Sequence, residues 1–260
     1  MSIIYIESAA ITHVGLVRTK NEDNYYVNGK IKEDMKLPTE GYAETEDHDA
    51  YLYAVCDGMG GEGLGEVASM IAVKVLGDFQ MTDIRQSAID YMQRANKLIC
   101  YASEKNNGVT IGTTLALLYI HGNKAISYNV GDSRVYLLRK KELYLLSEDH
   151  TEAARMVNMG VISEEDAKHH PAKHKLTQYL GVSSEEMIIE PYISQEIKVK
   201  KNDIFLVCSD GLTNMVTDDE IREILSLKKF DVVSLAKELS AAAEAHGGKD
   251  NTTVVVAKVF

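Results

Sequence analysis

Short runs of apolar residues, many of them β-branched or aromatic, recur along the whole chain. Runs of this length predict β-strands, because β-branched and aromatic side chains suit a pleated, partly buried surface. Two junctions, at residues 121–124 and 139–142, carry turn residues and predict hairpins with antiparallel strands. The predicted strands cover residues 5–14, 23–28, 50–57, 113–121, 123–130, 133–139, 192–198, 203–208 and 252–259.

Helical periodicity separates these strand groups. Apolar residues at steps of three and four predict helices over 82–107 and 231–246, and Thr217 followed by Glu220 predicts a capping box that opens a helix to about Leu225. Because the helices fall between runs of strands, an α+β layered fold is favoured over a doubly wound sheet. The predicted buried faces are Ile84, Ala88, Tyr91, Met92, Ala95, Leu98 and Ala102 in the first helix, and Val232, Leu235, Ala236, Leu239, Ala242 and Ala243 in the second.

Two segments interrupt this pattern. Residues 29–49 are polar and acidic with little periodicity, which favours a solvated loop between two strands over a functional lid. Residues 150–181 have a helical pattern but lie between strand groups, so they are a candidate flap over a site. We expect the whole chain, 1–260, to form one domain, because this length is enough for one large core.

Charge and composition narrow the function. The chain has 39 acidic and 28 basic residues and a net charge of -11, so binding to nucleic acid or to an anionic membrane is not expected. The apolar stretches are too short for a membrane span and the N-terminus lacks a basic leader region, which predicts a cytoplasmic protein. Cys56, Cys100 and Cys208 are an odd, widely spaced set and are expected to be reduced thiols.

Three aspartates stand at the ends of predicted strands, each beside glycine or asparagine. Asp57 follows the run 50–56, Asp210 follows 203–208, and Asp250 precedes 252–259. Carboxylates in fixed positions, next to glycines that allow close approach, provide the oxygen ligands that a hard divalent cation needs. The sequence therefore predicts metal-assisted chemistry.

Other motifs join these aspartates in a fixed order along the chain. They are Arg18-Thr-Lys-Asn-Glu22-Asp23, Asp57-Gly58-Met59-Gly60-Gly61, Gly112-Thr113-Thr114, Asn129-Val-Gly131-Asp132-Ser133-Arg134, Asp149-His150, Ser209-Asp210-Gly211-Leu212 and Gly248-Lys249-Asp250-Asn251. Together they resemble the metal-dependent Ser/Thr protein phosphatases of the PP2C (PPM) family, in particular its compact bacterial members. The resemblance implies a four-layer α-β-β-α sandwich with two central antiparallel sheets and metal ions at one end.

The resemblance also implies metal ligands. Asp57 would bridge two Mn²⁺ or Mg²⁺ ions, the Gly58 carbonyl would bind the first ion, and Asp210 and Asp250 would complete the second. Asp132 would join Asp210 at a possible third ion. Two such ions lower the pKa of a shared water and neutralise charge on a phosphoryl group, which is what phosphate ester hydrolysis requires.

Further residues acquire roles from the same match. Glu22 and Asp23 would hold metal-bound waters, and Arg18 would bind the substrate phosphate, for which its planar fork of donors is suited. Met59 stands where eukaryotic members have a histidine thought to protonate the leaving alcohol. Methionine has no proton to donate, so the general acid is another residue or a water.

Several residues also have plainer explanations. Asp132 could be a hairpin turn residue with Arg134 as its partner, and Gly112-Thr113-Thr114 are expected to pack near the site. His169, His170 and His174 resemble a zinc cluster, but without cysteine partners a solvated face of the flap is favoured. His150, by the family match, is expected to shape the flap hinge.

The predicted function is that of a bacterial, metal-dependent protein phosphatase. It would hydrolyse phosphoserine and phosphothreonine in phosphorylated proteins by direct attack of a metal-bridging water, and would oppose a Ser/Thr kinase. Two alternatives stay open: a pseudo-phosphatase that only binds phosphoproteins, and a hydrolase of small phosphoesters.

Overall fold

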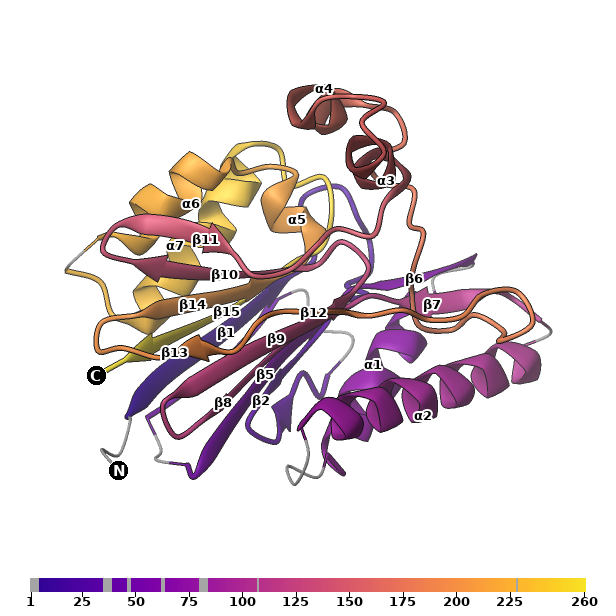
Figure 1. Ribbon diagram of the computed structural model, residues 1–260, viewed down its shortest axis with the longest axis horizontal. Coiled ribbons are helices and arrows are strands. Elements are labelled where there is room, and N and C mark those ends of the chain that lie inside the picture. Colours follow the sequence, from indigo (N-terminus) through magenta and orange to yellow (C-terminus); the bar gives the residue numbers. More distant parts are fainter. Residues whose placement is uncertain are drawn as a thin grey trace.

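Two large antiparallel sheets lie face to face in the computed structural model (Figure 1), which describes residues 5–34, 39–45, 48–61, 64–79, 84–106, 108–227 and 229–260. The first sheet has the strand order β11-β10-β14-β15-β1-β4. Its strands are β1 (Ile6–His13), β4 (Thr39–Glu44), β10 (Arg134–Arg139), β11 (Glu142–Leu145), β14 (Ile204–Cys208) and β15 (Thr252–Val259).

The second sheet has the order β12-β9-β8-β5-β2-β3, and β13 also pairs with β9. Its strands are β2 (Asn24–Val27), β3 (Lys30–Ile31), β5 (Ala50–Cys56), β8 (Leu115–His121), β9 (Lys124–Val130), β12 (Tyr192–Ile193) and β13 (Ile197–Lys198). A separate small sheet pairs β6 (Gly58–Gly60) with β7 (Ile111–Thr113).

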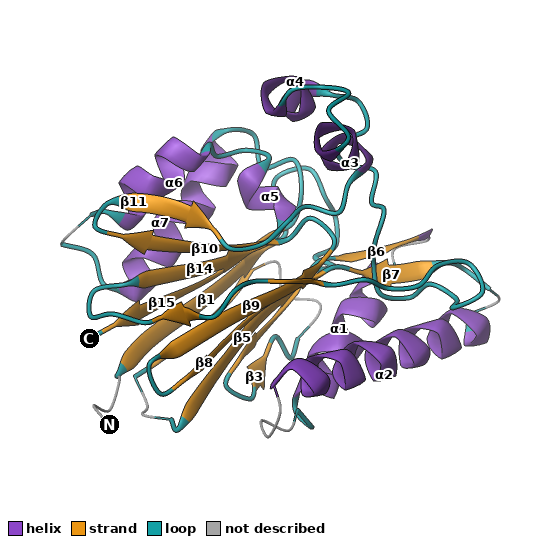
Figure 2. Cartoon of the chain, in the orientation of Figure 1, coloured by secondary structure: helices purple, strands orange, loops and turns teal. Residues whose placement is uncertain are grey.

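Helices cover the outer face of each sheet (Figure 2). The helices α1 (Gly65–Leu76) and α2 (Ile84–Lys105) pack on the second sheet, and α6 (Asp218–Leu225) and α7 (Val232–Ala245) pack on the first. The short α5 (Asp210–Thr213) directly follows β14. These layers confirm the predicted α-β-β-α sandwich.

Three apolar cores lie between the four layers. Because successive side chains of a strand point to opposite faces, one strand contributes side chains to two of these cores. In β5, Leu52 and Ala54 face the helices α1 and α2, whereas Tyr51, Tyr53 and Val55 face the other sheet. Strands buried on both faces read as continuous apolar runs, which is why the sequence predicted them well.

Most local predictions are confirmed. Both hairpins form, with His121 paired to Lys124 and Arg139 paired to Glu142. Thr217 and Glu220 make the predicted capping box of α6. The three cysteines are free thiols, and two of them, Cys56 and Cys208, are buried.

The loop predicted for residues 29–49 is wrong in part. Within it β4 (Thr39–Glu44) pairs with β1 at the edge of the first sheet, and β3 pairs with β2; residues 35–38 and 46–47 lie outside the described ranges. Strand β4 lies at the edge of the sheet, and most of its side chains are exposed or half-buried. Its sequence therefore lacks the apolar run that predicts a strand, although its backbone pairs with a neighbour.

Helix α1 was absent from the predictions. It begins at a glycine, Gly65, has no side-chain N-cap hydrogen bond and contains several β-branched residues. Its local helix preference is therefore weak, and its burial against β5 and β7 stabilises it. In α2, Leu98 is 41 % exposed and Ile99 is buried instead, which corrects the predicted face. Residues 82, 83 and 107 and the side chain of Ile84 lie outside the description.

The candidate flap, residues 150–181, contains two short helices, α3 (Glu152–Asn158) and α4 (Glu164–His169). Both stand away from the layers of the sandwich, above α5 (Figure 1). The ends of the segment are fastened by isolated bridges, Thr151 to Leu176 and Thr113 to Leu180. The helical pattern is therefore confirmed, and the segment is attached at its base.

Gly211 allows α5 to pack against the residues that precede β15. A Cβ atom on Gly211 would lie 1.8 Å from the backbone oxygen of Asn251, a contact that no side chain could relieve. We expect Gly211→Ala to lower the free energy of unfolding by at least about 1–3 kcal/mol, the usual cost of overpacking. Urea titration measures this change.

Gly41→Ala, on strand β4, is the matched control for Gly211→Ala. Its Cβ would meet the nearest atom, the oxygen of Ala10, at an ordinary 3.4 Å, so its unfolding midpoint should stay close to that of the unchanged protein. Equal midpoints for the two variants would contradict the packing argument.

Candidate metal centre

The predicted acidic residues gather at one end of the sandwich, because the strands that carry them end or begin there. Asp57 follows β5, and Asp210 follows β14. Cys208 pairs with Val254, which brings the start of β15 and the preceding Asp250 beside the end of β14. Asn24 pairs with Cys56, which brings Asp23 next to Asp57.

The backbone of Asp57 is fixed by two threonines. Its N–H donates to Oγ1 of Thr114 at 3.0 Å, and its carbonyl accepts from the Thr114 N–H and the Thr113 hydroxyl, both at 2.9 Å. Burial raises the pKa of the Asp57 carboxyl well above its usual range, and the charges of Asp23 and Asp210 raise it further. The Gly-Thr-Thr motif, expected only to pack near the site, thus also holds the backbone of Asp57 in place through these hydrogen bonds.

Gly58 lies where the backbone of three segments meets. A Cβ atom there would be 2.2 Å from the oxygen of Gly65 and 2.5 Å from the oxygen of Glu22. Glu22 in turn accepts from the Gly65 N–H at 3.0 Å, at the beginning of α1. Glycine at 58 therefore allows the Asp57 turn, the Glu22 loop and α1 to pack together.

Asp23 is completely buried, and only one of its carboxyl oxygens has partners. Oδ2 accepts from the Ser209 hydroxyl at 2.8 Å and from the Thr253 hydroxyl at 2.7 Å, whereas Oδ1 has no hydrogen-bond partner among the described residues. Burial, with smaller contributions from the charges of Asp210 and Asp250, raises the pKa of Asp23 to about 7. An unpartnered buried carboxylate oxygen is a costly feature that a cation would relieve.

Lys32 lies behind Asp23 and was missed by the sequence analysis. Its ammonium group is fully buried and donates to the backbone oxygens of Asn21 at 2.8 Å and Asp23 at 3.1 Å. Burial lowers the pKa of Lys32, and the charge of Asp23 opposes that effect. The residue falls in the polar segment 29–49, where no sequence signal distinguishes a buried lysine from a solvated one.

Arg18 reaches across to Asp250, with Nη2 2.7 Å from Oδ2. The arginine side chain is 56 % exposed, so its guanidinium is open to solvent while it touches the acidic cluster. Asn251, for which the sequence suggested no role, ties the two segments together. Its Oδ1 accepts from the Glu22 N–H at 2.7 Å, and its Nδ2 donates to the oxygens of Val14 and Lys20.

Asp132 is buried at the turn before β10, and burial together with the charge of Asp210 raises its pKa well above the usual range. The alternative expectation, that Asp132 pairs with Arg134, is wrong. Arg134 instead makes a bidentate pair with Asp149, at 2.8 and 2.6 Å. Asp132 therefore faces the acidic cluster without an arginine bonded to it.

The base of the flap adjoins the same region. His150 Nδ1 accepts from the Gly131 N–H at 3.1 Å, and its carbonyl accepts from the Thr177 N–H at 2.8 Å. Further along the flap, His169 is solvated as expected, with its side chain 82 % exposed. His174, in contrast, lies beside the acidic cluster, with its Nδ1 3.7 Å from Oδ2 of Asp210.

The acidic side chains lie within electrostatic range of one another without forming a coordination sphere. In the part of the chain that the structure describes, no three His, Cys, Asp or Glu side chains are already gathered closely enough to hold an ion. Nevertheless the charges of Asp23, Asp210, Asp132 and Asp250 act on the buried Asp57 carboxyl, and the charge of Asp210 acts on Asp132. The raised pKa values of Asp23, Asp57 and Asp132 and the free buried Oδ1 of Asp23 fit hard divalent cations, which supply the missing positive charge.

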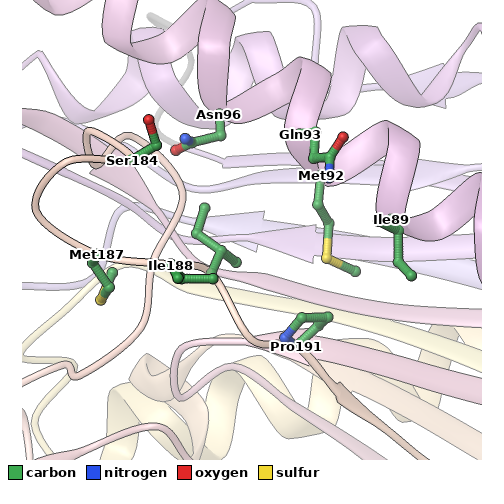
Figure 3. A pocket seen from close by; sticks show the side chains of 9 residues that line it. Ile89, Met92, Gln93, Asn96, Ser184, Met187, Ile188 and Pro191 are labelled. Carbon is green, nitrogen blue, oxygen red and sulfur yellow. The ribbon is translucent and has the colours of Figure 1, made fainter.

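A cavity of about 200 Å³ lies elsewhere, between α2 and residues 184–191 (Figure 3). Ile89 and Met92 from the helix face Ile188 and Pro191 across it. None of the predicted site residues lines this cavity, so it is separate from the acidic cluster.

Comparison with known proteins identifies the class. The family model described as protein phosphatase 2C matches residues 26–251. The chain is 34 % identical to the serine/threonine phosphatase stp of Listeria monocytogenes over 94 % of its own length and 92 % of that protein. It therefore belongs to the protein phosphatase 2C family, as the sequence motifs predicted, and is a protein phosphatase.

Solved structures agree with this assignment. The serine/threonine phosphatase of S. agalactiae superimposes with a TM-score of 0.84 and 28 % identity, covering 98 % of this chain and all of that one. The catalytic domain of PstP in complex with two manganese ions has a TM-score of 0.80 and 30 % identity, covering 99 % of each chain. The predicted divalent metal cofactor is thus supported, with manganese observed in PstP. Among the described residues, no helix is long and apolar enough to cross a membrane.

The raised pKa of Asp23 predicts how stability depends on pH in metal-free protein. Between the ordinary carboxyl pKa near 3.8 and the folded value of about 7, the unfolded chain releases a proton that the folded chain keeps. Deprotonation therefore favours unfolding, and stability should fall as pH rises through this window.

Urea unfolding in EDTA at about pH 5 and about pH 7.5 measures this dependence, and Asp23→Asn should show a smaller fall. The amide of the variant can still accept from Ser209 and Thr253 but carries no titratable proton. The same fall in the variant would contradict the assignment to Asp23.

Proposed function

We propose that this chain hydrolyses phosphoserine and phosphothreonine in proteins with two Mn²⁺ or Mg²⁺ ions. The observation that carries the proposal is the cluster of mutually repelling carboxylates beside an exposed arginine, at one end of a protein phosphatase 2C sandwich. Relatives named as serine/threonine phosphatases support the substrate class. We further infer that the enzyme opposes a bacterial Ser/Thr kinase and that residues 1–260 form one domain.

The proposed metal ligands divide between the two ions. Asp57 would contact both, the Gly58 carbonyl would bind the first, and Asp210 and Asp250 would bind the second. Asp132 with Asp210 would hold a third ion, which the burial of Asp132 at the edge of the cluster supports. When bound, the ions supply a water of lowered pKa and neutralise charge on the phosphoryl group.

The chain's own residues orient the substrate and the waters. Arg18 would exchange its contact with Asp250 for two phosphate oxygens, since its side chain is exposed and its planar guanidinium can donate to both. Glu22 and Asp23 would hold waters of the metal centre, and the free Oδ1 of Asp23 is available for this role. Met59 has no ionisable proton, so the leaving oxygen takes its proton from another group or from water.

A pseudo-phosphatase is disfavoured because every proposed acidic ligand is present and Lys32, Ser209, Thr253 and Asn251 hold the segments that carry them. Binding of phosphoproteins without phosphate release would favour that alternative. A small phosphoester hydrolase would show a higher kcat/KM for metabolites than for phosphopeptides.

Loss of the proposed ligands should abolish activity. Asp57→Asn and Asp210→Asn should each reduce Mn²⁺-dependent release of phosphate from a phosphothreonine peptide by at least about 100-fold, because even outer groups of a metal site contribute about 10–100-fold. EDTA should do the same to the unchanged enzyme.

The matched control is Asp219→Asn, whose carboxylate is 86 % exposed on α6 and should leave the rate unchanged. Full activity in Asp57→Asn, or activity insensitive to EDTA, would refute the proposed mechanism.

Arg18 should contribute mainly to binding of the phosphate. Arg18→Ala should lower kcat/KM for the phosphopeptide about 10- to 100-fold, because a hydrogen bond to a charged group contributes about 1.5–3 kcal/mol. Arg18→Lys should recover only part, since an ammonium cannot form the bidentate contact. Steady-state kinetics on both variants, with Arg222→Ala on α6 as control, measure this; equal kinetics for Arg18→Ala and Arg222→Ala would contradict the assignment.

A further inference from the structure

Asn214, the residue that follows the short helix α5, donates a side-chain hydrogen bond to a proposed metal ligand. Its Nδ2 lies 2.8 Å from Oδ2 of Asp210, which is four residues earlier in the chain. The backbone joins the same two residues, because the Asn214 N–H donates to the Asp210 carbonyl at 2.8 Å. Side chains four residues apart are neighbours on a helical turn, so the local fold places the amide beside the carboxylate.

The backbone that carries Asp210 is fixed by other contacts. The Ser209 N–H donates to the Thr253 carbonyl at 3.0 Å, and the Thr253 N–H donates to Oγ of Ser209 at 2.9 Å. Gly211 is packed closely against the backbone oxygen of Asn251. With the backbone held on both sides, rotation of the Asp210 side chain is the remaining freedom, and the hydrogen bond from Asn214 selects one orientation.

This hydrogen bond uses only part of the Asp210 carboxylate. A carboxylate offers about four lone-pair positions on its two oxygens. Asn214 occupies one position on Oδ2, and Oδ1 has no hydrogen-bond partner among the described residues. The Asp210 side chain is only 18 % exposed, so few water molecules can replace the amide. Asn214 therefore orients the carboxylate and leaves it able to bind a cation.

The flap places a second group near the same oxygen. Nδ1 of His174 lies 3.7 Å from Oδ2 of Asp210 and 3.5 Å from Nδ2 of Asn214. The first distance exceeds the roughly 2.7–3.2 Å of an ordinary hydrogen bond between nitrogen and oxygen. The amide of Asn214, rather than the imidazole of His174, is thus the group that directly holds the carboxylate.

We propose that Asn214 is a positioning residue that holds Asp210 in the orientation in which it binds a divalent cation. The proposal rests on the proposed function, in which Asp210 is a metal ligand. Loss of a hydrogen bond to a ligating carboxylate lowers metal affinity by about 10–100-fold in other metal sites. Without the amide, the Asp210 side chain gains rotational freedom that cation binding has to remove, which weakens binding.

Calorimetric titration of the metal-free protein with Mn²⁺ tests this inference. The relevant binding is the part that is lost in Asp210→Asn. Asn214→Ala should raise the Kd of this binding about tenfold, at the low end of the effect of such outer contacts. Asn214→Gln keeps an amide donor and should recover part of the affinity, because glutamine and aspartate four residues apart on a helix also form a hydrogen bond.

Gln86→Ala is the matched control. Nε2 of Gln86 donates to Oδ1 of Asp90 at 2.7 Å, so α2 contains an amide–carboxylate pair with the same spacing but outside the acidic cluster. This variant loses a comparable hydrogen bond and should keep the Mn²⁺ affinity of the unchanged protein. An unchanged Kd in Asn214→Ala, an equal rise in Gln86→Ala, or no recovery in Asn214→Gln would overturn the role of Asn214.

Failure of the proposed function is distinguishable through Asp210→Asn. If that variant loses Mn²⁺ binding and phosphate release while Asn214→Ala binds Mn²⁺ like the unchanged protein, the role of Asn214 is wrong and the phosphatase proposal stands. If Asp210→Asn binds Mn²⁺ like the unchanged protein, Asp210 is not a metal ligand, and both the proposed ligand set and the role of Asn214 are wrong.

Discussion

The burial of several carboxylates close to one another is the constraint on which the rest of this structure depends. Asp23, Asp57 and Asp132 are each disfavoured as anions by burial and by one another's charge, or by that of Asp210. Bringing like charges together out of water is costly unless something opposes it. The surrounding residues must therefore hold the acidic segments in place in the folded chain, and a cation must complete the arrangement.

The groups that hold these segments come from distant parts of the chain. Ser209 and Thr253 donate to Asp23, and Lys32 donates to the carbonyls beside it. Asn251 fastens the loop that carries Arg18 and Glu22. Each of these contacts satisfies a buried polar group, so the network both offsets the cost of burial and fixes the geometry that a metal centre requires.

The same fastening holds the loop before Arg18. This loop is bonded to the Gly248 turn through the Leu16 N–H and to Asn251 through the Val14 carbonyl. The proposed phosphate-binding arginine is thus carried by a segment that the strands of the sandwich hold in place.

The sequence by itself determined the strands buried on both faces, both hairpins, the capping box of α6, the family and the acidic residues that gather at one end of the sandwich. These features have strong local signals, either apolar runs or motifs of fixed spacing. Only the tertiary structure decided that β4 is an edge strand, that α1 is a helix, that Arg134 pairs with Asp149, and that Lys32 is buried behind Asp23. All four features depend on residues that are far away in the chain. The edge strand needs a neighbouring strand to pair with, and the weak helix needs a surface to pack on. The arginine chooses between two carboxylates, and the lysine is buried only because other segments cover it.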